Sequence, residues 1–356
     1  MKNYHFDDHK LIYHTERVNK FLCEGDCFPL YMEISPVGNC NHRCVFCAYD
    51  YIGHPNKKLE TGRLLRFIDE IAACGMKSLL YAGEGEPLLH PDIAQFIIHS
   101  KKSGIDVGMF TNGQFMKEEL LEEILPSLTF VRISFNGGSR ENYAAIHNVK
   151  PEVFDTVVKN IEIAVRMKNK SRLETDIGLQ YVLLPENIDY LIDAVKRMRE
   201  TGISYFVIKP FVQQSHLQSY QMKEQFNLST IEDTLSKAES LSHENFKVIA
   251  RKASFENYGK RKYKHCYGTA FISVLNSAGD IATCLPYWDK KEFVFGNIYE
   301  NTFKGIWFGE KRKKIKEYLE NELDAVAACP PNCRPNAINE FLWEIKNPSV
   351  RHINFV

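Results

Sequence analysis

Six short apolar runs, separated by amphipathic segments, organise the chain from residue 30 to residue 208. Their length and their β-branched and aromatic content are typical of buried strands, and the segments between them repeat apolar residues with helical periodicity. The predicted strands are 30–35, 78–81, 106–110, 130–135, 176–184 and 204–208, and the predicted helices are 63–74, 91–103, 118–125, 153–167 and 188–201. Alternating strands and helices indicate parallel βα units. We therefore predict an α/β fold, a partial (β/α)6 TIM-like barrel.

A loop with three cysteines, Cys40, Cys44 and Cys47, follows the first predicted strand. Such a tight loop with an odd number of thiols is poorly suited to disulfide pairing. Thiolates are the usual ligands of iron–sulfur clusters, and three of them leave one iron of a four-iron cluster without a protein ligand. An open metal position is available for chemistry, whereas a fully ligated one is typical of structural sites. The loop therefore predicts a reactive cluster, with structural zinc as the alternative.

Polar residues gather where the other predicted strands end, which is where barrel enzymes carry their active sites. The second strand is followed by Gly83, Glu84, Gly85, Glu86 and Pro87. The two glycines allow the backbone to pass close to a ligand, and Glu86 brings a carboxylate to the barrel mouth. Read alone, this segment is also consistent with an ordinary glycine-rich turn. Further candidates at strand ends are Asn112, Ser134, Asn136 and Gln180, followed on the substrate side by Gln213, Gln214 and His216.

A second group of cysteines lies in the C-terminal part of the chain, at Cys266, Cys284, Cys329 and Cys333. Residues 270–275 and 281–284 are predicted to form two short strands about a turn at 277–280. A hairpin flanked by cysteines, with a second pair after a helix, supplies four thiolates for one metal centre. Four cysteines suit a fully ligated four-iron cluster or a tetrahedral zinc ion.

Composition narrows the class of protein. The formal net charge is +0, so no basic surface for nucleic acid is predicted. Hydrophobic residues make up 44% of the 356 residues, which is ordinary for a globular protein. Residues 1–20 are polar, and no apolar run approaches the roughly 18 residues of a membrane helix. Ten cysteines without a secretion signal favour a reducing compartment and metal binding. We therefore expect a cytoplasmic protein with no membrane or nucleic-acid partner.

The spacing of Cys40, Cys44 and Cys47, with the aromatic Phe46 before the third cysteine, resembles the radical S-adenosylmethionine (radical SAM) superfamily. The resemblance implies a [4Fe–4S] cluster on these cysteines, with SAM bound at the open iron. It also implies that the residues contacting SAM are Phe46, Gly83, Gly85, Glu86, Asn112, Ser134 and Asn136. Gln180, the polar residue of the fifth predicted strand, is a candidate for binding SAM or substrate, with an amide bonded to the backbone as the alternative. Two departures stand out: Gly-Glu-Gly-Glu-Pro replaces the common Gly-Gly-Glu-Pro, and Asn136 stands where relatives usually carry aspartate.

The C-terminal cysteines and the segments 295–298 and 303–307 resemble the SPASM/twitch extension of radical SAM enzymes. The resemblance implies one auxiliary [4Fe–4S] cluster with four cysteine ligands. The expected organisation is a lead-in at 1–29, the barrel at 30–215, a helical connector at 216–258, the auxiliary-cluster domain at 259–335, and a C-terminal helix and tail at 336–356.

The implied activity is reductive cleavage of SAM to a 5′-deoxyadenosyl radical, which takes a hydrogen atom from the substrate. An auxiliary cluster that transfers electrons suggests an oxidoreductase or epimerase, acting on a sugar-like small molecule. A peptide- or protein-modifying maturase is the alternative, and a non-catalytic iron–sulfur or zinc protein is a third class. The first cluster also needs a reductant such as flavodoxin or ferredoxin.

Overall fold

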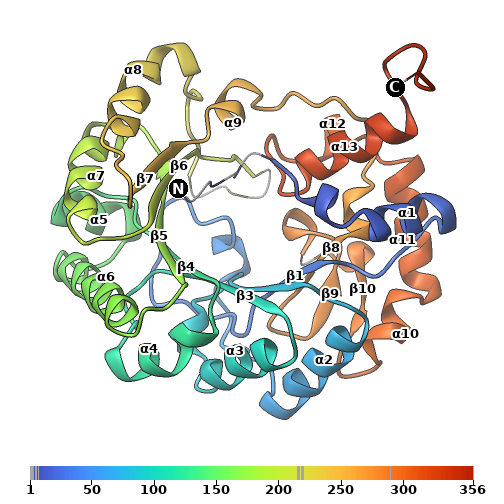
Figure 1. Cartoon of the computed structure of the whole chain (residues 1–356), viewed down its shortest axis with the longest axis horizontal. Coiled ribbons are helices and arrows are strands. Elements are labelled where there is room, and N and C mark those ends of the chain that lie inside the picture. The colour runs from blue at the N-terminus through green and yellow to red at the C-terminus, as the bar shows by residue number, and fades with distance from the viewer. Residues whose placement is uncertain are drawn as a thin grey trace.

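The computed structural model describes residues 4, 6, 8–214, 217, 220–288 and 290–355, and one ten-stranded sheet runs through it (Figure 1). The strands are β1 (Tyr31–Ile34), β2 (Ser78–Tyr81), β3 (Asp106–Thr111), β4 (Phe130–Ser134), β5 (Asp176–Leu183), β6 (Tyr205–Pro210), β7 (Lys247–Ala250), β8 (Ile272–Leu275), β9 (Asp280–Ala282) and β10 (Val294–Asn297). Their order across the sheet is β10-β9-β8-β1-β2-β3-β4-β5-β6-β7.

Helices accompany the strands along the chain. They are α1 (Thr15–Glu24), α2 (Thr61–Ala73), α3 (Ile93–Lys102), α4 (Glu118–Ile124), α5 (Arg140–His147), α6 (Glu152–Lys170), α7 (Leu191–Arg199), α8 (Leu228–Glu239), α9 (Lys252–Glu256), α10 (Phe303–Trp307), α11 (Glu310–Asn321), α12 (Ala325–Ala328) and α13 (Asn336–Lys346). Helices α2 to α8 lie around the outer side of the curved sheet, as expected of a partial barrel (Figure 1). The predicted α/β partial barrel is confirmed.

Strands β1 to β7 are all parallel neighbours, so the barrel has one strand more than the six predicted. The extra strand, β7, lies within residues 216–258, which we expected to be a helical connector. Its four residues are too few for their alternation of apolar and polar side chains to be recognised as a strand, because charged helical segments surround them in the sequence. The open edge of β6 supplies the hydrogen bonds that stabilise it, so tertiary context decides its conformation.

The C-terminal strands continue the same sheet. β8 runs parallel to β1, with Tyr31 opposite Ile272, while β9 and β10 complete an antiparallel meander. The predicted hairpin is therefore present, with β9 at Asp280–Ala282 in place of 281–284. Because β8 joins the edge of the barrel, the region of the second cysteine group is fixed relative to the first.

Successive side chains of each strand point to opposite faces of the sheet. One face packs against the helices and forms the apolar core, and the other face lines the polar lumen of the barrel. Met32 and Ile34 of β1 belong to the main hydrophobic cluster, whereas Glu33 between them faces the lumen. The rings of Phe130 and Tyr205 close the amino end of the lumen. They fit because glycines stand opposite them: a Cβ on Gly108 would lie 2.3 Å from Phe130 and one on Gly178 would lie 2.2 Å from Tyr205.

Candidate active site with two groups of cysteines

The loop of Cys40, Cys44 and Cys47 leaves β1 at the carboxyl end of the barrel strands. Backbone hydrogen bonds from Arg43 N to His147 O (3.1 Å) and from Val45 N to Ile146 O (3.0 Å) hold it against α5. Burial raises the pKa of all three thiols, to about 12 for Cys40, and the neighbouring cysteines raise the pKa of Cys40 and Cys44 further. Cysteine binds iron as the thiolate, so assembly of a cluster on these three buried thiols would release their protons.

The segment after β2 packs directly against the cysteine loop. The Glu86 amide donates to Asn39 O at 2.9 Å, and a Cβ on Gly85 would lie 2.2 Å from Val37 O. Gly83 has a φ of +101°, and a Cβ there would lie 2.4 Å from Ser35 Cβ. The two glycines are therefore needed for close packing against β1 and the cysteine loop, whereas their predicted approach to a ligand stays a prediction.

Glu86 is 3% exposed, and its carboxylate is held by three donors. Thr111 Oγ1 and the Asn112 amide donate at 2.7 Å each, and the Leu88 amide donates at 3.1 Å. Burial raises the pKa of Glu86 to about 7, and the three hydrogen bonds oppose that rise. A carboxylate fixed in this way is suited to a cationic ligand group such as an ammonium.

Asn112 lies beside the cysteine loop and orients it. Its Nδ2 donates to Asn41 Oδ1 at 2.8 Å, and Asn41 Nδ2 donates to Gln114 Oε1 at 2.6 Å. The side chain thus supports the loop that carries Cys40, and the sequence alone gave no indication of Asn41 and Gln114 as its partners.

Asn136, which follows β4, is buried between β5 and the end of α5. It is 1% exposed, its Oδ1 accepts the Val182 amide at 2.7 Å, and its Nδ2 lies 3.3 Å from His147 Nε2. One lone pair of Oδ1 and one hydrogen of Nδ2 remain beyond these two partners. The assignment of Asn136 to SAM therefore stays a prediction.

The remaining predicted contacts lie at the barrel mouth. Ser134 and Gln180 are register partners on β4 and β5, both partly exposed and both on the lumen side. Phe46 packs partly buried in a small cluster that includes Phe211 and Leu217. These positions are compatible with a ligand above the lumen. His216 lies outside the described residues.

The second cysteine group comes together in space, as predicted. Cys266, Cys284, Cys329 and Cys333 all line one cavity of about 110 Å³. Burial raises the pKa of each thiol, to about 12 for Cys266 and about 11 for Cys329, and neighbouring cysteines add to the rise at Cys266, Cys284 and Cys329. Four sulfurs around one cavity fit a fully ligated metal centre.

This cavity also borders the barrel lumen. Its lining includes Tyr31 of β1, Gln214 after β6, and Arg334 next to Cys333. Arg334 Nη1 lies 2.7 Å from Glu33 Oε2, and Glu33 is only 3% exposed. The ion pair links the second cysteine group to the interior of the barrel.

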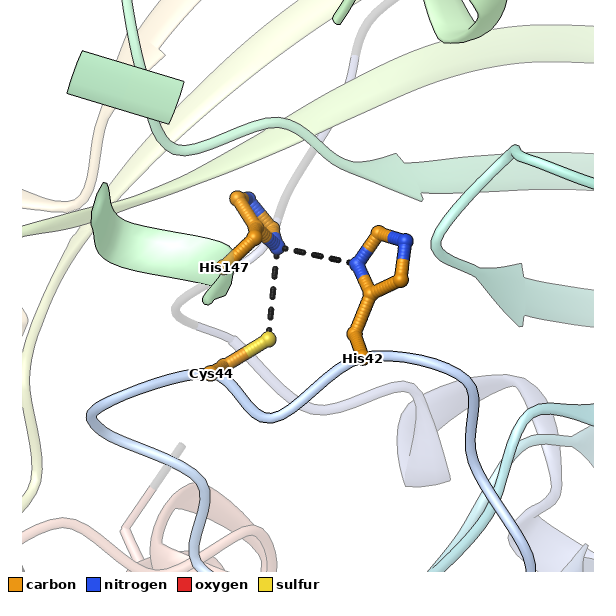
Figure 2. Close-up of side chains that lie close together, drawn as sticks. All are labelled: His42, Cys44 and His147. Carbon is orange, nitrogen blue, oxygen red and sulfur yellow. Dashed lines mark hydrogen bonds between the residues drawn. The ribbon is translucent and has the colours of Figure 1, made fainter. Parts of the chain in front are cut away.

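Three contacts around the two cysteine groups were not predicted from the sequence. Glu84 and Arg334 pair with residues far away in the chain, and His147 reaches the cysteine loop from the end of α5 (Figure 2). Glu84 carried a signal, because it is the residue that departs from the common motif. No local pattern marks the other two.

Comparison with known proteins agrees with this geometry. A model of the radical SAM superfamily matches residues 34–204, and a model of the SPASM iron–sulfur cluster-binding domain matches residues 266–334. The two matches together span more than half of the chain. The protein belongs to the radical SAM superfamily.

Two curated relatives align over most of this radical SAM protein. GTP 3′,8-cyclase of Campylobacter fetus is 28% identical over 274 residues, covering 73% of this chain and 81% of the relative. AdoMet-dependent heme synthase of Methanosarcina barkeri is 22% identical over 293 residues, covering 75% and 79%. The solved structure of Streptococcus suis SuiB bound to S-adenosylmethionine has a TM-score of 0.67 at 16% identity, covering 95% of this chain and 79% of that one. At this identity SuiB supports the shared fold alone.

As a member of the radical SAM superfamily, this protein binds a [4Fe–4S] cluster and SAM. The match to the SPASM domain indicates that it also binds auxiliary iron–sulfur. Both donor sets fit: three thiols share one loop and four line one cavity. Within the described residues, no helix is long and apolar enough to cross a membrane.

Proposed function

We propose that this radical SAM enzyme is an oxidoreductase or epimerase of a sugar-like small molecule, with one auxiliary [4Fe–4S] cluster as electron carrier. Cys40, Cys44 and Cys47 would hold the SAM-cleaving cluster. Cys266, Cys284, Cys329 and Cys333 would hold the auxiliary cluster. The observation that carries the proposal is the four-cysteine cavity bordering the lumen through Tyr31 and Arg334.

A [4Fe–4S] cluster held by the cysteine loop would supply the electron that cleaves SAM to a 5′-deoxyadenosyl radical. The chain's own residues then have defined tasks. Glu86 binds the SAM ammonium, and Gly83 and Gly85 let the main chain approach SAM. The remaining contacts with SAM come from Phe46, Asn112, Ser134 and Gln180. Loss of a hydrogen atom, an electron and a proton would turn a substrate alcohol into a ketone, and a cluster held by the four C-terminal cysteines would be able to accept that electron. An epimer would form if a hydrogen-atom donor on the other face of the substrate returned a hydrogen atom.

The charge of the lumen favours a substrate with an acidic group. Lys209 at the end of β6 lies beside Arg251, because the Arg251 amide donates to Ile208 O at 2.9 Å. Burial lowers the pKa of Lys209 to about 7, and Arg251, Arg334 and Arg132 lower it further. Glu33 already pairs with Arg334. A phosphate or carboxylate on the substrate would offset this positive charge.

The GTP named in the first relative is a sugar-bearing anion, which is the same chemical class. A peptide substrate is the second candidate, because a structure of SuiB bound to precursor peptide SuiA resembles this fold with a TM-score of 0.65. At 17% identity this likeness extends to the fold and leaves the substrate open.

The test is a substrate screen with anaerobically reconstituted enzyme, SAM and dithionite. Sugar phosphates, uronic acids and short peptides are compared by their stimulation of 5′-deoxyadenosine formation above the substrate-free rate. We expect stimulation by an acidic sugar, and deuterium transfer from labelled substrate into 5′-deoxyadenosine. A product lighter by two hydrogens identifies dehydrogenation, whereas uptake of one solvent deuterium identifies epimerisation. Stimulation by peptides alone would contradict the proposal.

A further inference from the structure

His147, at the C-terminal end of α5, is completely buried and lies against one of the three loop cysteines. Its Nδ1 is 3.2 Å from Cys44 Sγ and 3.4 Å from His42 Nδ1 (Figure 2). Two backbone hydrogen bonds, from Arg43 and Val45 to the end of α5, flank Cys44 and fix this approach. The chemical role of the contact depends on which ring nitrogen of His147 carries hydrogen.

The other ring nitrogen of His147 faces only donors. Asn136 N lies 3.4 Å from His147 Nε2, and Asn136 Nδ2 lies 3.3 Å from it. The orientation of the Asn136 amide is certain, because its Oδ1 accepts the Val182 amide at 2.7 Å. A hydrogen on Nε2 would point at two N–H groups, so Nε2 is the acceptor and Nδ1 carries the hydrogen.

A second chain of hydrogen bonds decides the state of His42, and it also begins at a backbone amide. Gln114 N donates to Asn112 Oδ1 at 3.0 Å, so Asn112 presents its Nδ2 to Asn41 Oδ1. Asn41 therefore presents its own Nδ2 to Gln114 Oε1, which also faces His42 Nε2 at 2.9 Å. Since this oxygen only accepts, His42 Nε2 carries the hydrogen and His42 Nδ1 is an acceptor.

The two series of hydrogen bonds therefore place a single hydrogen between the two histidines, on His147 Nδ1. This hydrogen is directed toward the Cys44 sulfur and the lone pair of His42 Nδ1. We infer that His147 is a positioning residue that donates an N–H···S hydrogen bond to Cys44 in the cluster-bearing loop. Burial, and secondarily the neighbouring His42, lowers the pKa of His147 well below its usual range, in agreement with a neutral ring.

The same three residues could also suggest a separate metal site, because their ligand atoms lie within 4.8 Å of one another. A metal ion needs a lone pair from each histidine. His147 Nδ1 has none to offer when it carries the hydrogen. The hydrogen-bond directions therefore favour an N–H···S contact over a metal ion.

Hydrogen bonds to the sulfurs of an iron–sulfur cluster are one of the factors that set its reduction potential. A donor stabilises the reduced form more than the oxidised form, since the reduced cluster carries more negative charge. The Nδ1–H of His147 thus raises the potential of the SAM-cleaving cluster and makes it easier to reduce. This inference rests on Cys44 being a cluster ligand, and it is independent of which substrate the enzyme uses.

The test compares wild type with His147→Phe, which removes the donor, and His147→Asn, whose amide nitrogen replaces Nδ1. Tyr81→Phe is the control, because it removes a buried hydroxyl that bonds to Phe96 O and Ser100 Oγ on the helix side of β2. The readout is the midpoint potential, by EPR-monitored titration, of the cluster whose signal changes when SAM is added.

We expect a more negative potential for His147→Phe, and wild-type potentials for His147→Asn and Tyr81→Phe. An unchanged potential in His147→Phe would overturn the inference. If that variant assembles no cluster, two other measurements decide: the potential of His147→Asn, and the tautomer of His147 in the cluster-free chain from long-range ¹H–¹⁵N correlation. A hydrogen on Nε2, or an Asn variant with a potential well below wild type, would also overturn it. Failure of the reconstituted wild-type protein to cleave SAM would instead argue against the proposed function, whatever the potentials of the variants.

Discussion

The Glu84 carboxylate accepts a hydrogen bond from the indole Nε1–H of Trp288 at 3.0 Å, across 204 positions of sequence. Its second oxygen accepts the Ser277 amide at 2.8 Å, in the turn between β8 and β9. Glu84 lies in the glycine-rich segment after β2, while Trp288 follows a short 3₁₀ helix after Cys284. The residue that departs from the common motif therefore joins this segment to the SPASM part of the chain.

Replacing either partner should loosen this connection. Trp288→Phe leaves a buried carboxylate oxygen without its donor, and Glu84→Gln turns an amide N–H toward another donor. Each change should cost about 1–3 kcal/mol, since a buried polar group loses its partner. Thermal unfolding of the two single variants and the double variant measures this, and the effects should be less than additive. Trp343→Phe is the control, and equal losses there would show that the indole bond has no special role.

Gly85→Ala should disrupt the glycine-rich segment after β2 without disturbing the auxiliary site. A Cβ there would lie 2.2 Å from Val37 O and 2.4 Å from Asn39 O, which are backbone atoms of the cysteine loop. The expected result is loss of SAM binding, measured by equilibrium dialysis, with the auxiliary cluster retained. Gly104→Ala is the control: its added Cβ meets no atom within 4 Å, and its φ of +80° makes it mildly destabilising, so it should lower stability and keep SAM affinity. Wild-type SAM affinity in Gly85→Ala would contradict the assigned contact.

Anion binding in the lumen should depend on the charge of Lys209. The pKa of Lys209 is lowered to about 7, so the side chain is charged at pH 6 and largely neutral at pH 8. Sulfate, whose charge is constant over this range, should raise the thermal midpoint of the cluster-free chain more at pH 6 than at pH 8. Lys209→Met should abolish the difference, while Lys247→Met, at the amino end of the neighbouring β7, should keep it.

The same variant separates two possible anions. If Lys209 binds the carboxylate of SAM, Lys209→Met should raise the dissociation constant of SAM by about 10-fold or more, because a charged hydrogen bond is lost. If it binds the substrate, the affinity for SAM should stay unchanged. A wild-type protein with no pH-dependent sulfate effect would contradict the anion site itself.

Much of the barrel could be predicted from sequence, because each of its first six strands has an apolar run of its own and each helix an amphipathic face. The segment 78–81 was placed at the same residues as β2, and both cysteine groups were found because thiol spacing is a local signal. β7 was not predicted because four residues are too few to show a clear alternation of apolar and polar positions. α5 was not predicted because it is short and its apolar face directly follows a glycine turn.

The hydrogen-bond partners of Asn136 and Glu84 could not be predicted from the sequence, and the physical cause is the same for both. The role of Asn136 is decided by Val182 and His147, and that of Glu84 by Ser277 and Trp288. All four of these partners come from other elements of the fold. A single sequence states which groups are present, whereas the direction of each hydrogen bond depends on the packed structure.

The most direct test of the two-cluster account is the iron and sulfide content of three reconstituted proteins. They are wild type, Cys40/Cys44/Cys47→Ala, and Cys266/Cys284/Cys329/Cys333→Ala, each also assayed for 5′-deoxyadenosine with SAM and dithionite. We expect about eight irons in wild type and about four in each variant, since each site holds one four-iron cluster. Deoxyadenosine should form in wild type and in the second variant only. About four irons in wild type, none in the first variant and zinc in the second site would contradict the auxiliary electron carrier.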